Sequence, residues 1–190
     1  MNFSAVLLCG GESRRMGRDK ALVEWNGVVL WRTQLATLRA LHTDTIFLSA
    51  REDKQWRPSD VKLVLDGADP RGPISGITAV LRACETTHLV VLAIDLPLMT
   101  SAYLRKMIGH ASPACGIVPR IADRFEPACA IYPRQCVEAF DRGAASLQVL
   151  IAELIARGYI EALDVQPDER DLFKNVNEPS DLAASSVAQV

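Results

Sequence analysis

The sequence predicts an α/β fold in which a mostly parallel β-sheet is flanked by helices. Short apolar runs rich in β-branched residues alternate along the chain with longer segments whose apolar residues recur every three or four positions. This alternation is typical of parallel strands joined by crossover helices. A chain of 190 residues, 49% of them hydrophobic, is enough for one core but short for two. We therefore expect residues 1–190 to form one domain, with fraying in the last few, which are rich in alanine and serine.

Each short apolar run is a strand candidate, and these are residues 5–8, 45–48, 61–65, 89–93, 115–119 and 129–132. The intervening segments place apolar side chains on one face, as core-facing helices require. The helix candidates are residues 30–41, 75–83, 101–110, 134–142 and 147–157. Asn26 and Gly27 both tolerate positive φ and lie between apolar pairs, so a small β-hairpin is predicted before the first helix.

Charge and hydropathy exclude two kinds of partner. The formal net charge of −2 argues against a broadly basic surface that follows nucleic-acid phosphates, so any anion site must be local. The longest apolar candidate for a membrane span is interrupted by Asp95 and Pro97. The apolar run at residues 5–9 has no basic residues before it and no cleavage site after it, which favours a strand over a signal peptide. We expect a cytoplasmic protein that binds neither nucleic acid nor membrane.

The cysteines are odd in number, scattered, and nowhere in a C-x-x-C arrangement. That pattern favours buried, reduced thiols over a zinc site or a dithiol redox centre. The five are Cys9, Cys84, Cys115, Cys129 and Cys136.

The loop after the first strand is the most informative segment. Residues 7–20 read L-L-C-G-G-E-S-R-R-M-G-R-D-K and contain three glycines and four cations. Paired glycines let backbone N–H groups approach a phosphate, and cations neutralise its charge. The loop also follows the carboxyl end of a predicted parallel strand, where open α/β sheets bind ligands. Neither the P-loop nor the dinucleotide glycine pattern fits its spacing, and an ordinary solvated basic loop is the alternative.

The same string resembles the signature of the nucleotidyltransferase family that includes the molybdenum cofactor guanylyltransferases, L-x-G-G-x-S-x-R-M-G-x-D-K. The resemblance implies a single Rossmann-like domain of the nucleotide-diphospho-sugar transferase type. It also implies that Arg15 and Lys20 are catalytic cations and that GTP is bound by Leu8, Cys9, Gly10, Gly11 and Lys20. Relatives that transfer CMP usually lack the Gly-Gly pair and often lack an aspartate before the lysine, so this chain favours guanine.

Two later segments extend the resemblance to the nucleotide. Asp66, after the strand candidate 61–65, matches the family's GTP-binding aspartate. A carboxylate suits guanine because N1–H and the exocyclic amine are adjacent donors, although an aspartate beside Gly67 could also cap a turn. Residues 71–77 resemble the family's G-P-L-x-G-I segment, in which Ser75 is either a helix N-cap or a ligand. Ser49 stands where relatives often have a nucleotide-contacting asparagine.

Asp95 follows the strand candidate 89–93 and matches the aspartate of the family's P-C-D-x-P run, which binds Mg²⁺ and the nucleotide. Ala93 and Ile94 replace the proline and cysteine, whereas Asp95 and Pro97 are retained. Mg²⁺ keeps several waters and needs only one or two carboxylates plus phosphate oxygens. The resemblance thus implies Mg²⁺ as cofactor and Asp95 as its ligand and a catalytic residue, with a helix N-cap as the alternative.

The acceptor side of the site is implied by two further segments. Pro127 lies in residues 126–132, which resemble the family's P-x-x-A-x-Y. Asn175 and Asn177 lie in residues 174–182, which resemble its terminal N-x-N-x-P-x-D-L, and Pro179 is also compatible with a helix start.

The implied reaction is attack of the terminal phosphate of molybdopterin on the α-phosphorus of GTP, with release of pyrophosphate. The implied partners are GTP, molybdopterin or Mo-molybdopterin, and cofactor-insertion proteins or molybdoenzymes that receive the product. The alternatives are CMP transfer to the same cofactor, nucleotidyl transfer to a sugar or polyol phosphate, and a non-catalytic cofactor carrier. Retention of both Lys20 and Asp95 disfavours the carrier, which needs neither a triphosphate clamp nor a metal ligand.

Overall fold

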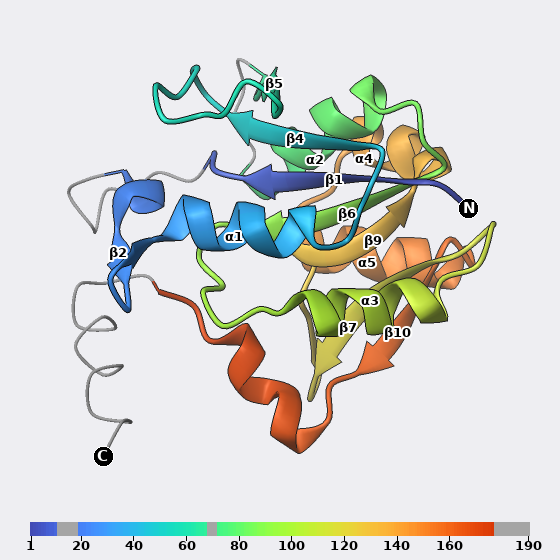
Figure 1. Ribbon diagram of the computed structural model, residues 1–190. Coiled ribbons are helices and arrows are strands. Elements are labelled where there is room, and N and C mark those ends of the chain that lie inside the picture. Colours follow the sequence, from blue (N-terminus) through green and yellow to red (C-terminus); the bar gives the residue numbers. More distant parts are fainter. Residues whose placement is uncertain (11–18, 68–71, 177–190) are drawn as a thin grey trace.

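The computed structural model describes residues 1–10, 19–67 and 72–176. These residues form a central sheet with helices on both faces (Figure 1). The sheet order is β10-β7-β9-β6-β1-β4-β5. Its strands are β1 (Phe3–Leu8), β4 (Thr45–Ala50), β5 (Lys62–Leu65), β6 (His88–Ala93), β7 (Gly116–Ile121), β9 (Cys129–Pro133) and β10 (Ile160–Asp164). A short strand, β8 (Arg124–Phe125), pairs with β7 beside this path.

The predicted α/β fold with a mostly parallel sheet is confirmed. The pairs β1–β4, β1–β6, β4–β5 and β7–β10 are parallel. Strand β9 is antiparallel to both β6 and β7. The chain passes from β7 to β9 through β8 and a short turn with no crossover helix, and short connections join antiparallel neighbours.

The two central strands are buried on both faces of the sheet. Successive side chains of a strand point to opposite faces, and β1 divides its residues between two hydrophobic clusters. Ala5 and Leu7 belong to one cluster, and Val6 and Leu8 to the other. Burial on both faces explains why β1 and β6 read as continuous apolar runs in the sequence.

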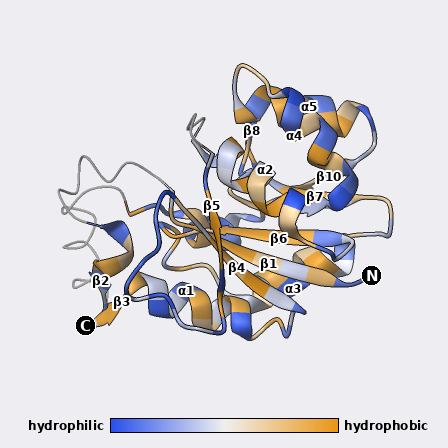
Figure 2. Cartoon of the chain, turned by 90° about the horizontal axis from the view of Figure 1, so that it is seen from above, coloured by the Kyte–Doolittle hydropathy of each residue, from blue (hydrophilic) through white to orange (hydrophobic). Residues whose placement is uncertain are grey.

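The helices are α1 (Leu30–Arg39), α2 (Pro73–Ala83), α3 (Ser101–His110), α4 (Val137–Arg142) and α5 (Leu147–Ala156). Helices α1 and α3 cover one face of the sheet, and α2, α4 and α5 cover the other (Figure 2). Hydrophobic residues concentrate on the central strands and hydrophilic residues on the outer faces of the helices (Figure 2). No helix in the described ranges is long and apolar enough to cross a bilayer.

The predicted hairpin is confirmed. Strands β2 (Glu24–Trp25) and β3 (Val28–Val29) pair antiparallel, and the turn residues Asn26 and Gly27 have φ of 51° and 76°. Both values lie in the left-handed region that a two-residue hairpin turn of this kind requires. The hairpin follows a single turn of 3-10 helix, η1 (Lys20–Leu22), and leads directly into α1.

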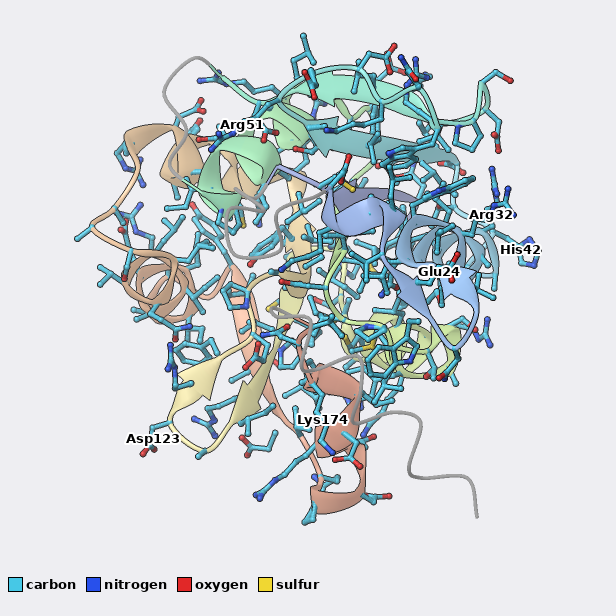
Figure 3. The ribbon with its side chains drawn as sticks, turned by 90° about the vertical axis from the view of Figure 1, so that its left-hand side faces the viewer. Glu24, Arg32, His42, Arg51, Asp123 and Lys174 are labelled. Atoms are coloured by element: carbon cyan, nitrogen blue, oxygen red, sulfur yellow. The ribbon has the colours of Figure 1, made fainter. Side chains whose placement is uncertain are left out.

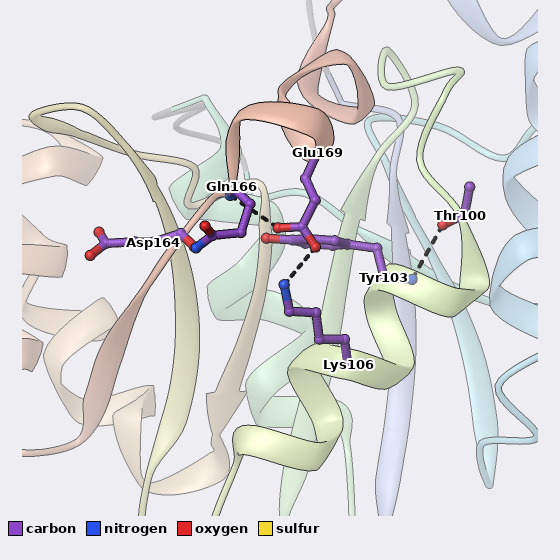
Figure 4. Close-up of polar contacts among 6 residues, drawn as sticks. All are labelled: Thr100, Tyr103, Lys106, Asp164, Gln166 and Glu169. Atoms are coloured by element: carbon purple, nitrogen blue, oxygen red, sulfur yellow. Dashed lines mark hydrogen bonds and ion pairs between the residues drawn. The ribbon is translucent and has the colours of Figure 1, made fainter.

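Several predicted boundaries are corrected. The helix predicted at 134–142 begins as a 3-10 turn, η2 (Arg134–Cys136), and α1 ends at Arg39, two residues early. The structure adds β8, β10 and a 3-10 helix, η3 (Pro167–Phe173), none of which was predicted. Helix η3 is held to α3 by the Lys106–Glu169 ion pair, and the same glutamate accepts a hydrogen bond of 3.0 Å from the Gln166 N–H (Figure 4).

All five cysteines are free thiols, as predicted. Cys84, Cys129 and Cys136 are buried, but Cys9 and Cys115 are only partly so, which corrects the expectation that all five are buried. Cys9 lies at the end of β1, where the polar edge of the sheet begins.

Candidate active site

A cavity of about 130 Å³ opens at the carboxyl ends of β1, β4, β5 and β6. Strand β1 lies between β4 and β6. The strands that follow β1 in the chain, β4 and β5, lie on one side of it, and the next strand, β6, lies on its other side. Open α/β sheets bind ligands at such topological switch points. Figure 3 looks onto this edge, with Arg51, Asp123 and Lys174 around it. The described lining residues include Leu8, Cys9, Gly10, Asp19, Lys20, Ser49, Asp66, Gly76, Asp95 and Ala128.

The structure brings together seven of the predicted site residues in this lining, although they lie as far apart in the sequence as Leu8 and Asp95. Three other predicted residues, Gly11, Arg15 and Asn177, lie outside the described ranges, as do Pro179 and the chain end predicted to fray.

The Asp66 carboxylate packs against Gly10 and is hydrogen-bonded to Ser49. The Ser49 hydroxyl donates to Asp66 Oδ1, and Ser49 itself is 1% exposed. A methyl group placed on Gly10 would lie 1.9 Å from Asp66 Oδ2, and one on Gly76 would lie 2.3 Å from Ser49 Oγ. Both glycines are therefore required for this close packing. The carboxylate thus contacts Ser49 of β4 and Gly10, which lies just beyond the end of β1.

Gly10→Ala is expected to displace the Asp66 carboxylate and to lower the free energy of unfolding by about 1–3 kcal/mol, the usual cost of forcing an atom into filled space. Affinity for nucleotide should fall with it, because Asp66 lines the same cavity. Urea unfolding and a nucleotide titration measure the two effects.

Gly67→Ala is the matched control, because no described atom lies within 4 Å of a methyl group placed there. It should change stability by less than about 0.5 kcal/mol, as surface substitutions usually do. Equal effects of the two substitutions would show that the contact between Gly10 and Asp66 is unimportant.

Lys20 and Asp95 form an ion pair on the other side of the cavity. Lys20 Nζ lies 3.2 Å from Asp95 Oδ2, and the two side chains are 17% and 25% exposed. Lys20 begins η1, whose N-cap is Asp19, with Asp19 Oδ1 accepting from the Ala21 N–H at 3.0 Å. The sequence prediction that Lys20 and Asp95 share one site is consistent with this contact.

Two N-cap alternatives are wrong. The N-cap of α3 is Thr100, whose side chain accepts from the Tyr103 N–H, so Asp95 does not cap this helix. Helix α2 has Gly72 at its N-cap, so Ser75 lies inside the helix. Asp95 therefore caps neither of these helices.

The turn containing Asp95 is fixed by backbone-directed hydrogen bonds from three elements. The Ile94 N–H donates to Leu8 O at 3.1 Å, and the Val176 N–H donates to Asp95 O at 2.9 Å. Gln34 of α1, which is fully buried, donates from Nε2 to Leu96 O. Sequence reasoning missed Gln34, although a signal exists: it lies four residues from both Leu30 and Leu38 on the buried face of α1, where a polar side chain is unexpected.

Neither Pro127 nor Asn175, the two predicted acceptor-side residues within the described ranges, is among the described lining residues of the cavity. Ala128 is in the lining, and the preceding Pro127 accepts a 2.7 Å hydrogen bond at its carbonyl oxygen from the Tyr132 hydroxyl. Asn175 is exposed, beside the Val176 that is bonded to Asp95, and is not among the described lining residues.

Asp95 interacts with a second carboxylate, that of Glu126. Burial raises the pKa of the Glu126 carboxyl; the Arg124 guanidinium opposes this rise, and the Asp95 carboxylate adds to it. Within the described ranges, no group of three or more His, Cys, Asp or Glu residues could hold a metal ion by itself. The residues present fit Mg²⁺, which takes one or two carboxylates and completes its shell with water and phosphate oxygens.

Cys9 is not an activated nucleophile. Burial raises the pKa of its thiol well above the usual value, and Asp19 adds to the rise, so the sulfur stays protonated at neutral pH. The cavity thus supplies charge and backbone groups for binding and no thiolate for covalent catalysis.

Lys54 was also missed by sequence reasoning. It lies in the loop between β4 and β5, and its Nζ is 3.2 Å from Asp19 Oδ2 and 3.3 Å from Glu52 Oε1. No local pattern marks it, because its relation to the site arises only when this loop folds against η1.

A cavity at a switch point, with a lysine and a carboxylate in contact inside it, is typical of the ligand-binding sites of open α/β proteins. Comparison with known proteins defines the class further. The chain belongs to the MobA-like NTP transferase domain family, whose sequence model matches residues 5–158. It is therefore an enzyme, a nucleotidyltransferase of molybdenum cofactor biosynthesis.

The similarity extends over nearly the whole chain. A molybdenum cofactor guanylyltransferase from Pseudomonas fluorescens is 32% identical over 95% of this chain and 92% of its own. A probable molybdenum cofactor guanylyltransferase from Opitutus terrae is 31% identical, with 94% and 92% covered. Among solved structures, molybdopterin-guanine dinucleotide biosynthesis protein A from Archaeoglobus fulgidus matches with a TM-score of 0.75 and 26% identity, with 96% of both chains covered.

Proposed function

We propose that this enzyme transfers GMP from GTP to the terminal phosphate of molybdopterin, forming the guanine dinucleotide cofactor and pyrophosphate. The observation that carries the proposal is the contact between Lys20 and Asp95 in the cavity at the ends of β1 and β6. The names of the curated relatives support the choice of guanine and of this acceptor.

In the proposed reaction, an ionised oxygen of the acceptor phosphate attacks the α-phosphorus of GTP. The bond from the α-phosphorus to the bridging oxygen breaks, and pyrophosphate leaves with the electron pair. The nucleophile already carries its charge, so no strong general base is required. Catalysis then consists of positioning and charge stabilisation, for which Lys20, Arg15 and the amides of the first loop are suited.

The nucleotide would bind along Leu8, Cys9, Gly10 and Gly11, and the acceptor on the side of Pro127, Asn175 and Asn177. The described cavity has a volume of about 130 Å³, below that of pockets that enclose a whole drug-sized ligand, so it would hold only part of a nucleotide. Asp95 would hold Mg²⁺, which supplies charge neutralisation at the triphosphate oxygens when bound. Cofactor-insertion proteins or molybdoenzymes would receive the product.

Ser49 is proposed to act on the nucleotide through Asp66. Its hydroxyl is engaged with the Asp66 carboxylate, where a free nucleotide contact was predicted from the sequence. Asp66 is proposed to accept hydrogen bonds from N1–H and the 2-amino group of guanine.

Asp66→Ala is expected to narrow the preference for GTP over ATP by roughly 10- to 100-fold. Adenine presents an acceptor at N1 and lacks the 2-amino group, so in the parent protein it offers no donor to the partly buried Asp66 carboxylate, which is also bonded to Ser49. Inosine triphosphate, which lacks only the 2-amino group, should fall between the two in the parent protein. Values of kcat/KM for the three nucleotides test this, and an unchanged preference in Asp66→Ala would place base recognition elsewhere in the loop.

Competition among GTP, CTP, ATP and UTP tests the nucleotide in the proposed reaction. GTP should be consumed in preference to the other three when molybdopterin is the acceptor. Preferential use of CTP would instead establish cytidylyl transfer, and turnover only with a sugar or polyol phosphate would remove molybdopterin as the acceptor.

A further inference from the structure

Asp19, which precedes the proposed catalytic lysine, is bound at both oxygens of its carboxylate. Oδ1 accepts from the Ala21 N–H at 3.0 Å, which caps the η1 turn. Oδ2 lies 3.2 Å from Lys54 Nζ. The first contact fixes the carboxylate to the turn that begins with Lys20, and the second fixes it to the β4–β5 loop. Lys20 is therefore presented from a turn anchored at two points.

Asp19 and Lys20 line the cavity, whereas Lys54 is absent from its described lining. Only 17% of the Lys54 side chain is exposed, so its position is restricted. Partial burial lowers the pKa of Lys54, but the contacts with Asp19 and Glu52 together outweigh it and raise the pKa, so the ammonium group is charged at any physiological pH.

The ion pair between Asp19 and Lys54 affects ligand binding because of the negative charge of Asp19. An unpaired Asp19 carboxylate would compete with Asp95 for the neighbouring Lys20. Pairing with Lys54 removes that competition. Lys20 is then left directed at Asp95, 3.2 Å away.

We propose that Lys54 is a positioning residue that acts through Asp19 to hold Lys20 in the geometry needed to bind a triphosphate. The proposal rests on the proposed function to the extent that Lys20 contacts the triphosphate. It assigns no contact between Lys54 and the nucleotide itself.

The test is a double-mutant cycle between Lys54→Met and Lys20→Ala. Methionine retains most of the apolar stem of lysine and removes the charge. The dissociation constants of Mg·GTP and of magnesium tripolyphosphate are measured by calorimetry, and kcat and KM for GMP transfer are measured where turnover is present. Lys54→Met should weaken binding and lower kcat/KM about 10-fold.

In the Lys20→Ala background, Lys54→Met should add less than about 2-fold, because the residue through which it acts has gone. Lys54→Arg should recover most of the loss by restoring the ion pair. Asp53→Asn is the matched control: it breaks the Asp53–Arg57 ion pair of 2.8 Å in the same loop and should change binding less than about 2-fold.

Two outcomes would overturn the proposal. A full 10-fold loss in the Lys20→Ala background would show that Lys54 contacts the ligand directly. A lower melting temperature in Lys54→Met with unchanged binding would show that the ion pair only stabilises the fold. Tripolyphosphate binding requires neither guanine nor molybdopterin, so failure of this proposal is distinguishable from failure of the proposed GMP transfer.

Discussion

Asp95→Asn is expected to lower Mg²⁺-dependent turnover roughly 1,000-fold, because a neutral amide replaces the carboxylate proposed to hold the ion against the triphosphate. The substitution preserves the size of the side chain, so the turn fixed by Leu8, Gln34 and Val176 should remain in place. Nucleotide should still bind weakly. Steady-state rates over a range of Mg²⁺ concentrations measure the effect.

Asp123→Asn provides the control for this charge change, because Asp123 is exposed in the β7–β8 turn and is absent from the cavity lining as described. It should retain the parent rate. Full Mg²⁺-dependent activity in a folded Asp95→Asn variant would remove Asp95 from the metal site and leave it as a structural partner of Lys20.

Lys20→Ala is expected to lose about 2–4 kcal/mol of transition-state stabilisation, or roughly 30- to 1,000-fold in rate, which is the usual effect of removing one preorganised charge-stabilising group. The effect should appear in kcat more than in KM if Lys20 binds the transition state better than the bound nucleotide. Arg15→Ala should be milder, because Arg14 and Arg18 are neighbouring cations in the sequence.

Lys106→Ala is the matched control for the loss of a lysine from a lysine–carboxylate pair. Lys106 contacts Glu169 between α3 and η3 and is absent from the described lining of the cavity (Figure 4). It should leave the rate unchanged within about 2-fold. If Lys20→Ala changed neither the rate nor the affinity for GTP, the first loop would be structural.

The sequence predicted those parts of the fold and site that depend on local patterns. Short continuous apolar runs located the central strands, because these strands are buried on both faces of the sheet. The sequence did not reveal the antiparallel direction of β9, which depends on the connection through β8. It also did not reveal the strand β10, whose five residues include two acidic ones at the sheet edge. The Asn-Gly hairpin was predictable because positive φ is a property of those two residue types.

The same division applies to the site. Lys20, Asp66 and Asp95 follow strands or belong to a recognisable loop string, and the fold brings them to one cavity. Lys54 and Gln34 could not be assigned from the sequence, because each gains its relation to the site from a contact with a residue distant in the chain. The engagement of Ser49 with Asp66 was unpredictable for the same reason.

The most direct test of the proposed GMP transfer is mass analysis of the product formed when purified protein is incubated with Mg²⁺, GTP and molybdopterin. We predict a molybdopterin guanine dinucleotide and an equal amount of pyrophosphate, both absent when Mg²⁺, GTP or molybdopterin is omitted. Absence of the guanine dinucleotide from the complete mixture, with a folded protein that binds GTP, would contradict the proposed reaction.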